Sequence, residues 1–318
     1  MITISHIISV YNKAPYLPYV AKALAGQLGG LLCEHIFVDD CSTDDSVSVL
    51  KGLARLYPNI VVIPNSQNKG PSVRVNQGAA AARGGFLQFV DSDDILAANS
   101  TALLYQLMNM AKADFIFGRA RVTKQSAASL VGTLANPSDP VFASSDPLNY
   151  VLKTGGFVRM ACMVEKKLFE KAGGCDEGVF IQDESLPLRL AAKSRRFVDF
   201  RGEVVLVPAF PDKAPEADTK EKVSHISDSD AQLNHDRFLA LLRFWESLEN
   251  PPPDISRMLY RHCVSAGWKQ ARKSSPLPQK ARIMASYLRS RLPKAATNPK
   301  TLVRLADMFA ALPGIRRI

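Results

Sequence analysis

Acidic or polar side chains follow three of the predicted strands in the first hundred residues. Asp39 and Asp40 come directly after one apolar run, and Asp91, Asp93 and Asp94 come directly after another. Carboxylates gathered at one edge repel one another unless a cation or hydrogen-bond donors neutralise them. Sites with one or two carboxylates suit Mg²⁺ or Mn²⁺ when substrate phosphates supply further oxygen ligands. The pattern therefore indicates a nucleotide diphosphate that is held through a divalent metal ion.

Each piece of this pattern also has a plainer interpretation. An Asp-x-Asp sequence is common in loops, and residues 42–45 could simply cap a helix. Residues 68–70, Asn-Lys-Gly, could form only a turn. The specificity comes from the combination, because the acidic pieces occur in this order and at the carboxyl ends of predicted strands.

The elements that must position these residues alternate along the first 120 residues. Apolar, β-branched runs predict strands at residues 3–10, 35–39, 60–64, 86–90 and 114–122. Helix signals predict helices at residues 15–28, 46–56, 72–82 and 100–112. Such repeats favour the α/β class, with a Rossmann-like, mainly parallel sheet flanked by helices. Ligands of these sheets bind at the carboxyl ends of the strands, where Ser9 and Tyr11 join the acidic residues.

The second half of the chain has a less regular pattern. Residues 123–150 are rich in Ser, Ala and Pro, which predicts mostly loop. The pattern then predicts strands and helices in the order 157–164, 166–172, 184–193 and 197–207. Pro187 fits the third of these, a helix, only in its first turn.

Proline-rich breakers divide the rest of the chain. Residues 208–227 carry three prolines and many charges, which predicts a flexible loop. Helices are predicted at residues 230–248, 255–270, 279–292 and 301–312. We therefore divide the chain into an α/β domain of residues 1–210, a loop of residues 211–229 and a C-terminal helical appendage of residues 230–318.

Composition excludes several classes of protein. The 318 residues are 47% hydrophobic and 22% charged, which is typical of globular domains and not of disordered chains. No apolar run approaches the ~20 residues that span a bilayer. The five cysteines form no Cys-x-x-Cys pair, so neither a disulfide framework nor a zinc site is indicated. We expect a cytoplasmic protein, since no secretory signal is visible.

Positive charge is concentrated near the end of the chain. Residues 251–318 hold 14 basic and two acidic residues, a net charge of +12, whereas the whole chain carries +10. This asymmetry predicts contact with a polyanion, or else a merely solvated surface. Residues 280–318 form basic amphipathic helices that could lie on an anionic, inner membrane face or pack on the domain. Nucleic acid is not expected, because few aromatic side chains are available for stacking.

The combined motifs resemble the inverting glycosyltransferases of family 2, which have the GT-A fold. The segments that carry the resemblance are SVYN (9–12), FVDDCSTDDS (37–46), NKGPSVRVNQGAAAARGGFLQFVDSDD (68–94), GGCDE (173–177) and QDESLPLR (182–189). They cover about residues 1–210. The resemblance implies a nucleotide-sugar-binding half, residues 1–122, and a half for the acceptor and the catalytic base, residues 123–210.

The resemblance assigns donor nucleotide binding to Ser9, Tyr11, Asp39, Asp40, Asn68, Gly70, Asn76, Asp91 and Ser92. In it Asp39 accepts a hydrogen bond from the base, Asp40 supports that loop, and Asn76 contacts the nucleotide or caps its helix. Asp91 and Asp93 form the metal-binding Asp-x-Asp pair for Mn²⁺ or Mg²⁺. His225, in a segment that closes over the donor in related enzymes, is a further candidate near the metal.

The resemblance makes Asp183 the general base, which takes a proton from the acceptor hydroxyl during transfer. Glu184 is the competing assignment, and Gln182 stands where the family more often has Glu. The implied activity is metal-dependent, inverting transfer of a sugar from a nucleotide diphosphate sugar to a hydroxyl of a glycan or lipid-linked acceptor. The alternative is a degenerate family member that serves as a nucleotide-binding or scaffold subunit.

Overall fold

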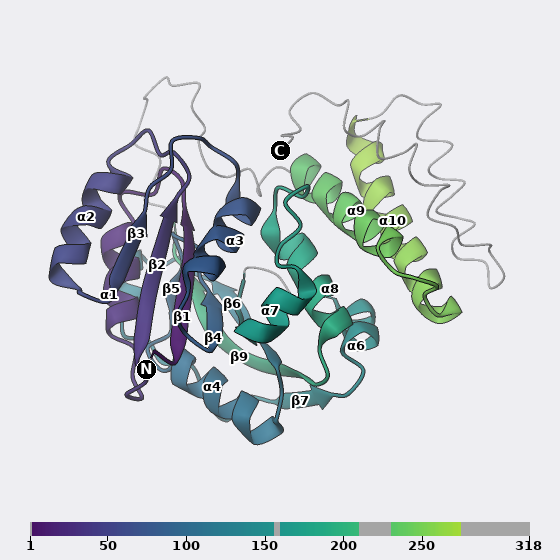
Figure 1. The fold of residues 1–318 in the computed structure, drawn as a ribbon, viewed down its shortest axis with the longest axis horizontal. Coiled ribbons are helices and arrows are strands. Elements are labelled where there is room, and N and C mark those ends of the chain that lie inside the picture. Colours follow the sequence, from purple (N-terminus) through teal and green to yellow (C-terminus); the bar gives the residue numbers. More distant parts are fainter. Residues whose placement is uncertain (1, 156–159, 210–229, 275–318) are drawn as a thin grey trace.

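The computed structural model of the protein describes residues 2–155, 160–209 and 230–274 (Figure 1). Its strands are β1 (Ile4–Val10), β2 (Cys33–Asp39), β3 (Ile60–Ile63), β4 (Phe86–Phe89), β5 (Ile95–Leu96), β6 (Phe115–Val122), β7 (Val141–Ser144), β8 (Cys162–Glu165) and β9 (Phe197–Val207). Its helices are α1 (Leu17–Ala25), α2 (Ser46–Leu56), α3 (Pro71–Ala81), α4 (Ser100–Ala111), α5 (Ala127–Leu130), α6 (Pro147–Thr154), α7 (Lys166–Ala172), α8 (Gln182–Lys193), α9 (Asp230–Glu246) and α10 (Pro253–Ser274).

The strands of the described residues form one sheet in the order β3-β2-β1-β4-β8-β6-β9-β5, and β7 also pairs with β9. The first four are parallel neighbours, whereas β8 runs antiparallel between β4 and β6. Because β6 and β9 run in the direction of β1, six of the nine strands share one direction. The predicted α/β class with a mainly parallel sheet flanked by helices is therefore confirmed.

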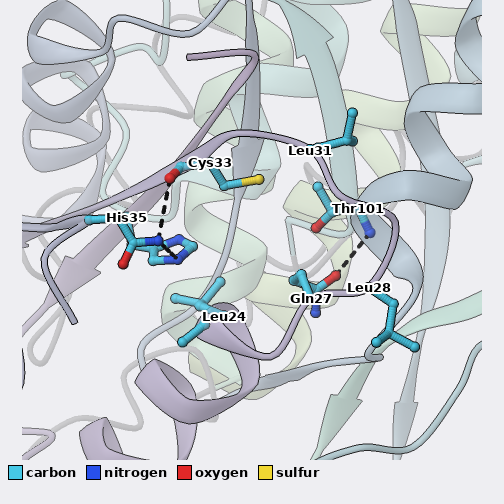
Figure 2. A pocket seen from close by; sticks show the side chains of 9 residues that line it. Leu24, Gln27, Leu28, Leu31, Cys33, His35 and Thr101 are labelled. Atoms are coloured by element: carbon cyan, nitrogen blue, oxygen red, sulfur yellow. Dashed lines mark hydrogen bonds between the residues drawn. The ribbon is translucent and has the colours of Figure 1, made fainter. Parts of the chain in front are cut away.

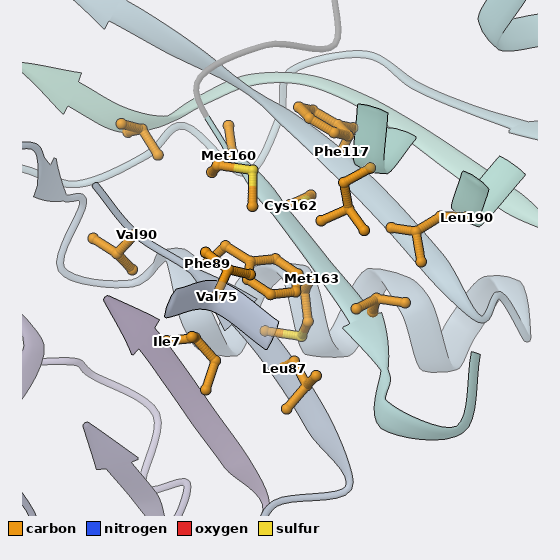
Figure 3. Packing of buried hydrophobic residues seen from close by; sticks show 14 of the residues in the cluster. Ile7, Val75, Leu87, Phe89, Val90, Phe117, Met160, Cys162, Met163 and Leu190 are labelled. Atoms are coloured by element: carbon orange, nitrogen blue, oxygen red, sulfur yellow. The ribbon is translucent and has the colours of Figure 1, made fainter. Parts of the chain in front are cut away.

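The core lies between this sheet and its helices. Figure 3 shows Phe89 of β4 beside Met163 of β8, with Ile7 of β1 and Val75 of α3 nearby. All four side chains are buried, and each contributes roughly 1.5–3 kcal/mol to folding. Strands buried on both faces require such continuous apolar runs, which is why the sequence pattern reveals them.

Helix α3 approaches the sheet more closely than a side chain would allow. A Cβ atom at Gly78 would lie 2.7 Å from Ile7 Cγ2 and 3.0 Å from Val38 Cγ2. Glycine at this position lets the helix rest directly on β1 and β2. The close contact fixes the side chains that α3 presents to the ends of those strands.

Several short elements differ from the sequence prediction. Residues 123–150, predicted as mostly loop, contain α5, β7 and the start of α6. These elements are four to eight residues long, which is too short for a periodic pattern to stand out. The two-residue strand β5 was not predicted for the same reason.

Helix α8 begins two residues earlier than predicted, at Gln182. Pro187 is therefore the sixth residue of the helix, and the prediction that it lies in the first turn is wrong. Proline has no backbone N–H, so it cannot donate the usual helical hydrogen bond to the carbonyl four residues earlier, here that of Asp183.

The C-terminal helices α9 and α10 pack against each other, and α9 also packs against α8 (Figure 1). Phe238 and Trp245 of α9 and Leu259 of α10 are buried in the same hydrophobic cluster as the sheet residues. No helix of the described part is long and apolar enough to cross a membrane. The predicted helices at residues 279–292 and 301–312 lie outside the described residues.

Candidate functional site

The carboxyl ends of β1, β2 and β4 meet along one edge of the sheet. Val10 lies opposite Asp39 in the parallel register, and the backbone N–H of Asp40 donates to Val10 O at 2.7 Å. On the other side of β1, Val90 N–H donates to Ile7 O at 3.1 Å. The loops that follow the three strands therefore start side by side, with Ser9 and Tyr11 partly exposed between them.

Asn12 joins the loops after β1 and β2. It adopts φ +51°, a left-handed conformation that asparagine tolerates better than most residues. Its Oδ1 accepts hydrogen bonds from the backbone N–H groups of Thr43, at 2.8 Å, and Asp44, at 3.3 Å. Its own N–H donates to Ser42 Oγ at 3.0 Å. These bonds set the position of the acidic loop relative to the end of β1.

Among the described residues, one carboxylate oxygen of Asp39 accepts a hydrogen bond and the other does not. Its side chain is buried, and its Oδ2 accepts the backbone N–H of Ser42 at 3.0 Å. Its Oδ1 is buried without a hydrogen-bond partner among the described residues. A buried acceptor left unsatisfied costs about 1–3 kcal/mol. A ligand that donates a hydrogen bond to this oxygen would recover that free energy.

Asp40, by contrast, is fully engaged in shaping the turn at residues 68–70. Its Oδ1 accepts from Lys69 N and its Oδ2 from Gly70 N, both at 2.8 Å. Asn68 Nδ2 donates in turn to Asp40 O at 3.1 Å. Gly70 adopts φ +86°, which favours glycine, and directly precedes α3. The Asp40 carboxylate therefore stabilises the turn at residues 68–70, beside this edge of the sheet.

Arg74 of α3 is a buried partner of Asp40 that sequence reasoning did not assign. Its Nε donates to Asp40 Oδ1 at 2.6 Å, and Nη1 and Nη2 donate to Gln77 Oε1 and Gln67 O. A buried carboxylate needs a compensating cation, and that general rule is the one signal that could have pointed to this arginine.

Asn76 directs its side chain to residues 175–177, in the turn that precedes α8. Its Nδ2 donates to Cys175 O and Glu177 Oε1, both at 3.0 Å, and its Oδ1 accepts from Cys175 N at 2.8 Å. The residue therefore links α3 to the turn that precedes α8. This geometry gives Asn76 a linking role between the two halves.

The loop after β4 carries the Asp-x-Asp pair. Asp94 N–H donates to Asp91 O at 3.1 Å, which turns the chain so that Asp91 and Asp93 are partly exposed and Ser92 and Asp94 are buried. Gln182 Nε2 of α8 donates to Asp91 Oδ1 at 3.3 Å. This contact brings the start of α8 to the Asp-x-Asp loop.

Asp93 forms an ion pair with Lys13, which sequence reasoning did not assign. Lys13 Nζ lies 2.5 Å from Asp93 Oδ2, and Lys13 N–H donates to Ser46 Oγ at 2.9 Å. A cluster of carboxylates requires a nearby cation, and Lys13, one residue beyond Asn12, is the cation that this loop supplies.

Metal binding by protein groups alone is not indicated. In the part of the chain that the structure describes, no three His, Cys, Asp or Glu side chains are grouped as a metal site. Asp91 and Asp93 offer carboxylate oxygens, the donor set that suits Mg²⁺ or Mn²⁺ when substrate phosphates complete the coordination. His225 lies outside the described residues.

The turn at the start of α8 carries Asp183 and Glu184. Arg237 of α9 donates to Glu184 with Nε at 2.8 Å and Nη2 at 2.7 Å. Burial raises the pKa of Glu184, and this arginine opposes the rise. Glu184 is thus engaged by a bidentate ion pair, while Asp183 beside it is partly exposed.

The buried thiol of Cys162 lies within electrostatic range of both Asp91 and Asp183. Burial raises the pKa of this thiol well above its usual value, and Cys175, Asp183 and Asp91 raise it further. Asp91 and Asp183 are therefore close enough to act electrostatically on one buried thiol of β8. The structure thus brings the Asp-x-Asp loop and the start of α8 together over the end of the sheet.

A separate pocket lies near the opposite ends of the strands (Figure 2). Its lining includes Gln27, Cys33, His35 and Asn59, and none of the predicted site residues. Asn59 Nδ2 and His35 Nε2 are 2.9 Å apart, and His35 Nδ1 lies 3.0 Å from His6 Nδ1. Burial lowers the pKa of both histidines, so this chain of hydrogen bonds is built from neutral rings.

Comparison with known families identifies one match. The model of the family described as Glycosyl transferase family 2 matches residues 5–172, which is more than half of the chain. The matched region includes the loops after β1, β2 and β4 and ends at the last residue of α7.

Curated relatives match over shorter regions. Minor teichoic acid biosynthesis protein GgaA of Bacillus subtilis is 35% identical over 105 residues, which are 32% of this chain and 24% of GgaA. The poly(ribitol-phosphate) beta-glucosyltransferase of Bacillus spizizenii is 32% identical over 120 residues, 37% of this chain and 19% of the relative. The match therefore spans about a quarter or less of the length of these two relatives.

Solved structures match over most of the chain. S. aureus TarS in complex with UDP-GlcNAc has a TM-score of 0.63 at 16% identity, with 91% of this chain and 81% of that chain covered. Mannosyltransferase PcManGT from Pyrobaculum calidifontis, in complex with GDP-Man and Mn²⁺, has a TM-score of 0.57 at 15% identity, with 97% and 85% covered. At these identities the likeness concerns the fold alone.

Proposed function

Since the chain belongs to glycosyl transferase family 2, we propose that it transfers a sugar from a nucleotide diphosphate sugar to a hydroxyl of a glycan or lipid-linked acceptor. The reaction inverts the anomeric centre. The observation that carries the proposal is the buried Oδ1 of Asp39, which has no partner among the described residues at the edge where the loops converge. That edge is where ligands of such sheets bind.

Asp39 selects the kind of base. Its carboxylate accepts a hydrogen bond, so it suits a base with a ring N–H on its pairing edge, as uracil (N3–H) and guanine (N1–H) have, whereas the ring nitrogen of cytosine at this edge is an acceptor. Both bases occur among the structural neighbours, with UDP-GlcNAc in TarS and GDP-Man in PcManGT. Ser9 and Tyr11 line the base and ribose, and the turn shaped by Asp40 closes the other side at Asn68 and Gly70.

Asp91 and Asp93 would hold the divalent metal, Mn²⁺ or Mg²⁺, and Ser92 would support their loop. When bound, the metal supplies positive charge that stabilises the departing nucleoside diphosphate. Mn²⁺ is present in PcManGT, which supports this assignment. Lys13, which now pairs with Asp93, would have to release this carboxylate for it to bind a metal.

Asp183 is the general base. It accepts the proton of the acceptor hydroxyl while that oxygen attacks the anomeric carbon on the side opposite the diphosphate, which gives inversion. Glu184 is the less suitable candidate, because Arg237 engages both of its oxygens. Partial exposure of Asp183 beside Asp91 supports an acceptor that enters between the two loops.

The acceptor class rests on the curated relatives. Their names refer to teichoic acid synthesis and to glucosyl transfer onto poly(ribitol-phosphate). We assign this chain an acceptor of the same chemical kind, a hydroxyl on a surface polymer or its lipid-linked precursor. Contact of residues 280–318 with an anionic membrane at the cytoplasmic face stays a prediction, since these residues lie outside the described ones.

The test compares UDP, GDP and CDP in thermal-shift assays, each with and without Mn²⁺, on the wild type and on Asp39→Ala. A ligand that binds the folded state raises the melting temperature. We expect UDP or GDP to stabilise the wild type, CDP to have little effect, and Asp39→Ala to lose about tenfold or more in affinity, as one charge-assisted hydrogen bond provides. Equal binding of all three nucleotides contradicts the role of Asp39.

A turnover assay distinguishes the transferase from the alternative, a scaffold subunit. Release of the nucleoside diphosphate from the donor that binds, lost in Asp183→Asn while nucleotide binding remains, supports the transfer mechanism. Nucleotide binding without transfer or donor hydrolysis in the wild type identifies the scaffold subunit instead.

A further inference from the structure

Two residues of α9 hold the turn that carries Asp183 from both sides. On one side, Arg237 forms the bidentate ion pair with Glu184, the residue after Asp183. On the other side, Asp236 Oδ2 accepts the backbone N–H of Ile181 at 2.8 Å. Ile181 is the residue that directly precedes α8. Contacts from one neighbouring helix thus bracket Asp183 in the sequence.

Asp236 is itself held in place. It is almost completely buried, and its Oδ1 accepts from Gln232 Nε2 at 2.8 Å and lies 2.9 Å from His235 Nδ1. Residue 181 offers no side-chain cap to α8. The start of α8 is therefore anchored by a carboxylate from another helix.

The turn needs such anchors because α8 cannot fully support it. Pro187 has no N–H to donate to the carbonyl of Asp183, and its ring crowds that carbonyl. A helix with an interior proline bends or opens at this point unless tertiary contacts fix it. The contacts with α9 lie at the affected turn.

We propose that Arg237 and Asp236 are positioning residues that fix the orientation of Asp183 for proton transfer. The inference rests on the proposed role of Asp183 as the general base. Arg237 acts through Glu184, because it binds the side chain of the residue next to Asp183 and neutralises a carboxylate beside the base. A displacement of about 1 Å in such a group can cost on the order of a hundredfold in rate.

Helix α9 also supplies a matched control. Arg243, two turns further along, forms the same bidentate pair with Asp176, at 2.7 and 2.9 Å. Asp176 lies in the turn before α8, seven positions before Asp183. Loss of this pair removes the same kind of contact between α9 and the rest of the protein, at a residue whose carboxylate does not contact residues 181–184 and whose backbone N–H reaches α8 only at Ser185 Oγ.

The experiment measures donor KM, kcat and melting temperature for Arg237→Gln and Arg243→Gln in the full-length protein. We expect Arg237→Gln to lower kcat by about tenfold or more while donor KM stays within about threefold. The reason is that Arg237 orients the general base and does not contact the residues proposed to bind the donor. Arg243→Gln should lower the melting temperature to a similar extent but keep kcat within about threefold. Equal kcat for the two variants overturns the inference.

A double-mutant cycle tests the route through Glu184. If Arg237 acts through this carboxylate, Arg237→Gln lowers kcat much less in a Glu184→Gln background than in the wild type. Additive losses overturn that route. If Arg237→Gln does not fold, Arg237→Lys, which keeps the charge but loses the two-point contact, replaces it and should show the same selective loss of kcat.

Asp183→Asn separates failure of the inference from failure of the proposed function. If that variant still transfers sugar at the wild-type rate, the base assignment is wrong and the positioning role falls with it. If it binds nucleotide but transfers nothing, the base assignment stands, and the comparison of Arg237 with Arg243 alone decides the inference.

Discussion

At the scale of single residues, the site is defined by which carboxylates have internal partners. Asp40 is committed to a turn and to Arg74, and Glu184 is committed to Arg237. Asp39 keeps one buried oxygen without a partner among the described residues. The carboxylates of Asp40 and Glu184 therefore shape the protein, whereas this oxygen of Asp39 suits a ligand that donates a hydrogen bond.

Lys13 and a divalent metal ion would compete for the carboxylate of Asp93. Replacement by Gln removes the cation that neutralises the carboxylate, so we expect the nucleotide-free protein to bind Mn²⁺ about three- to tenfold more tightly, in line with a partly buried ion pair. The measurement is a Mn²⁺ titration followed by electron paramagnetic resonance. Lys22→Gln, an exposed lysine of α1, is the control for net charge. Equal affinity of both variants for Mn²⁺ would show that Lys13 does not compete.

The residues that the sequence predicts for the site and those that only the structure adds differ in one physical respect. Asp39 and Asp91 were predicted from the ends of apolar strands, and Asp183 from a short motif that resembles the family. Lys13 and Arg237 matter through partners that are 80 and 53 positions away. Such pairs depend on strand order and helix packing, which no local pattern in a single sequence encodes.

At the scale of elements, the close approach of α3 to the sheet fixes this helix against β1 and β2 beside the candidate site. Long elements with a continuous apolar pattern, such as β1 and α2, were predicted to within a residue or two. Short ones such as β5 and β7 form only because β9 offers a hydrogen-bonding edge. Their existence is a tertiary effect, which explains why the sequence pattern did not reveal them.

Gly78→Ala tests the contact between α3 and the sheet. The new methyl group would lie 2.7 Å from Ile7 Cγ2, so we expect a loss of about 1–3 kcal/mol in the free energy of unfolding from overpacking. Urea unfolding measures the change. Gly52→Ala in α2 is the matched control, because a Cβ there meets nothing within 4 Å. That change should stabilise the protein by up to about 1 kcal/mol, and a similar gain at position 78 contradicts the close approach.

At the scale of the whole molecule, the buried histidine pair makes stability depend on pH. Burial lowers the pKa of His35 to about 4, partly offset by Glu34, and lowers that of His6 well below its usual value. Unfolded histidine titrates near 6.5. Below about pH 6.5 the two histidines take up protons in the unfolded chain but stay neutral in the folded chain. The free energy of unfolding therefore falls as the pH drops from about 6.5 toward 4.

The expected loss from His35 over this range is on the order of 3 kcal/mol. Urea midpoints at pH 7.5, 6, 5 and 4 measure it. His35→Gln, which cannot take up a proton, should be less stable at pH 7.5 but should lose less stability on acidification. An unchanged pH dependence in this variant would assign the effect to other groups.

The bonds of Asn76 limit how family members can exchange parts. Helix α3 lies in the predicted donor half, but its Asn76 satisfies the backbone at Cys175, in the half predicted to supply the base. A chimera that takes its first half from a relative without asparagine here leaves that turn without its partner. We therefore expect a change at position 76 in one part of the chain to disturb the turn before α8 in the other, so that recombination should keep both sides of this contact.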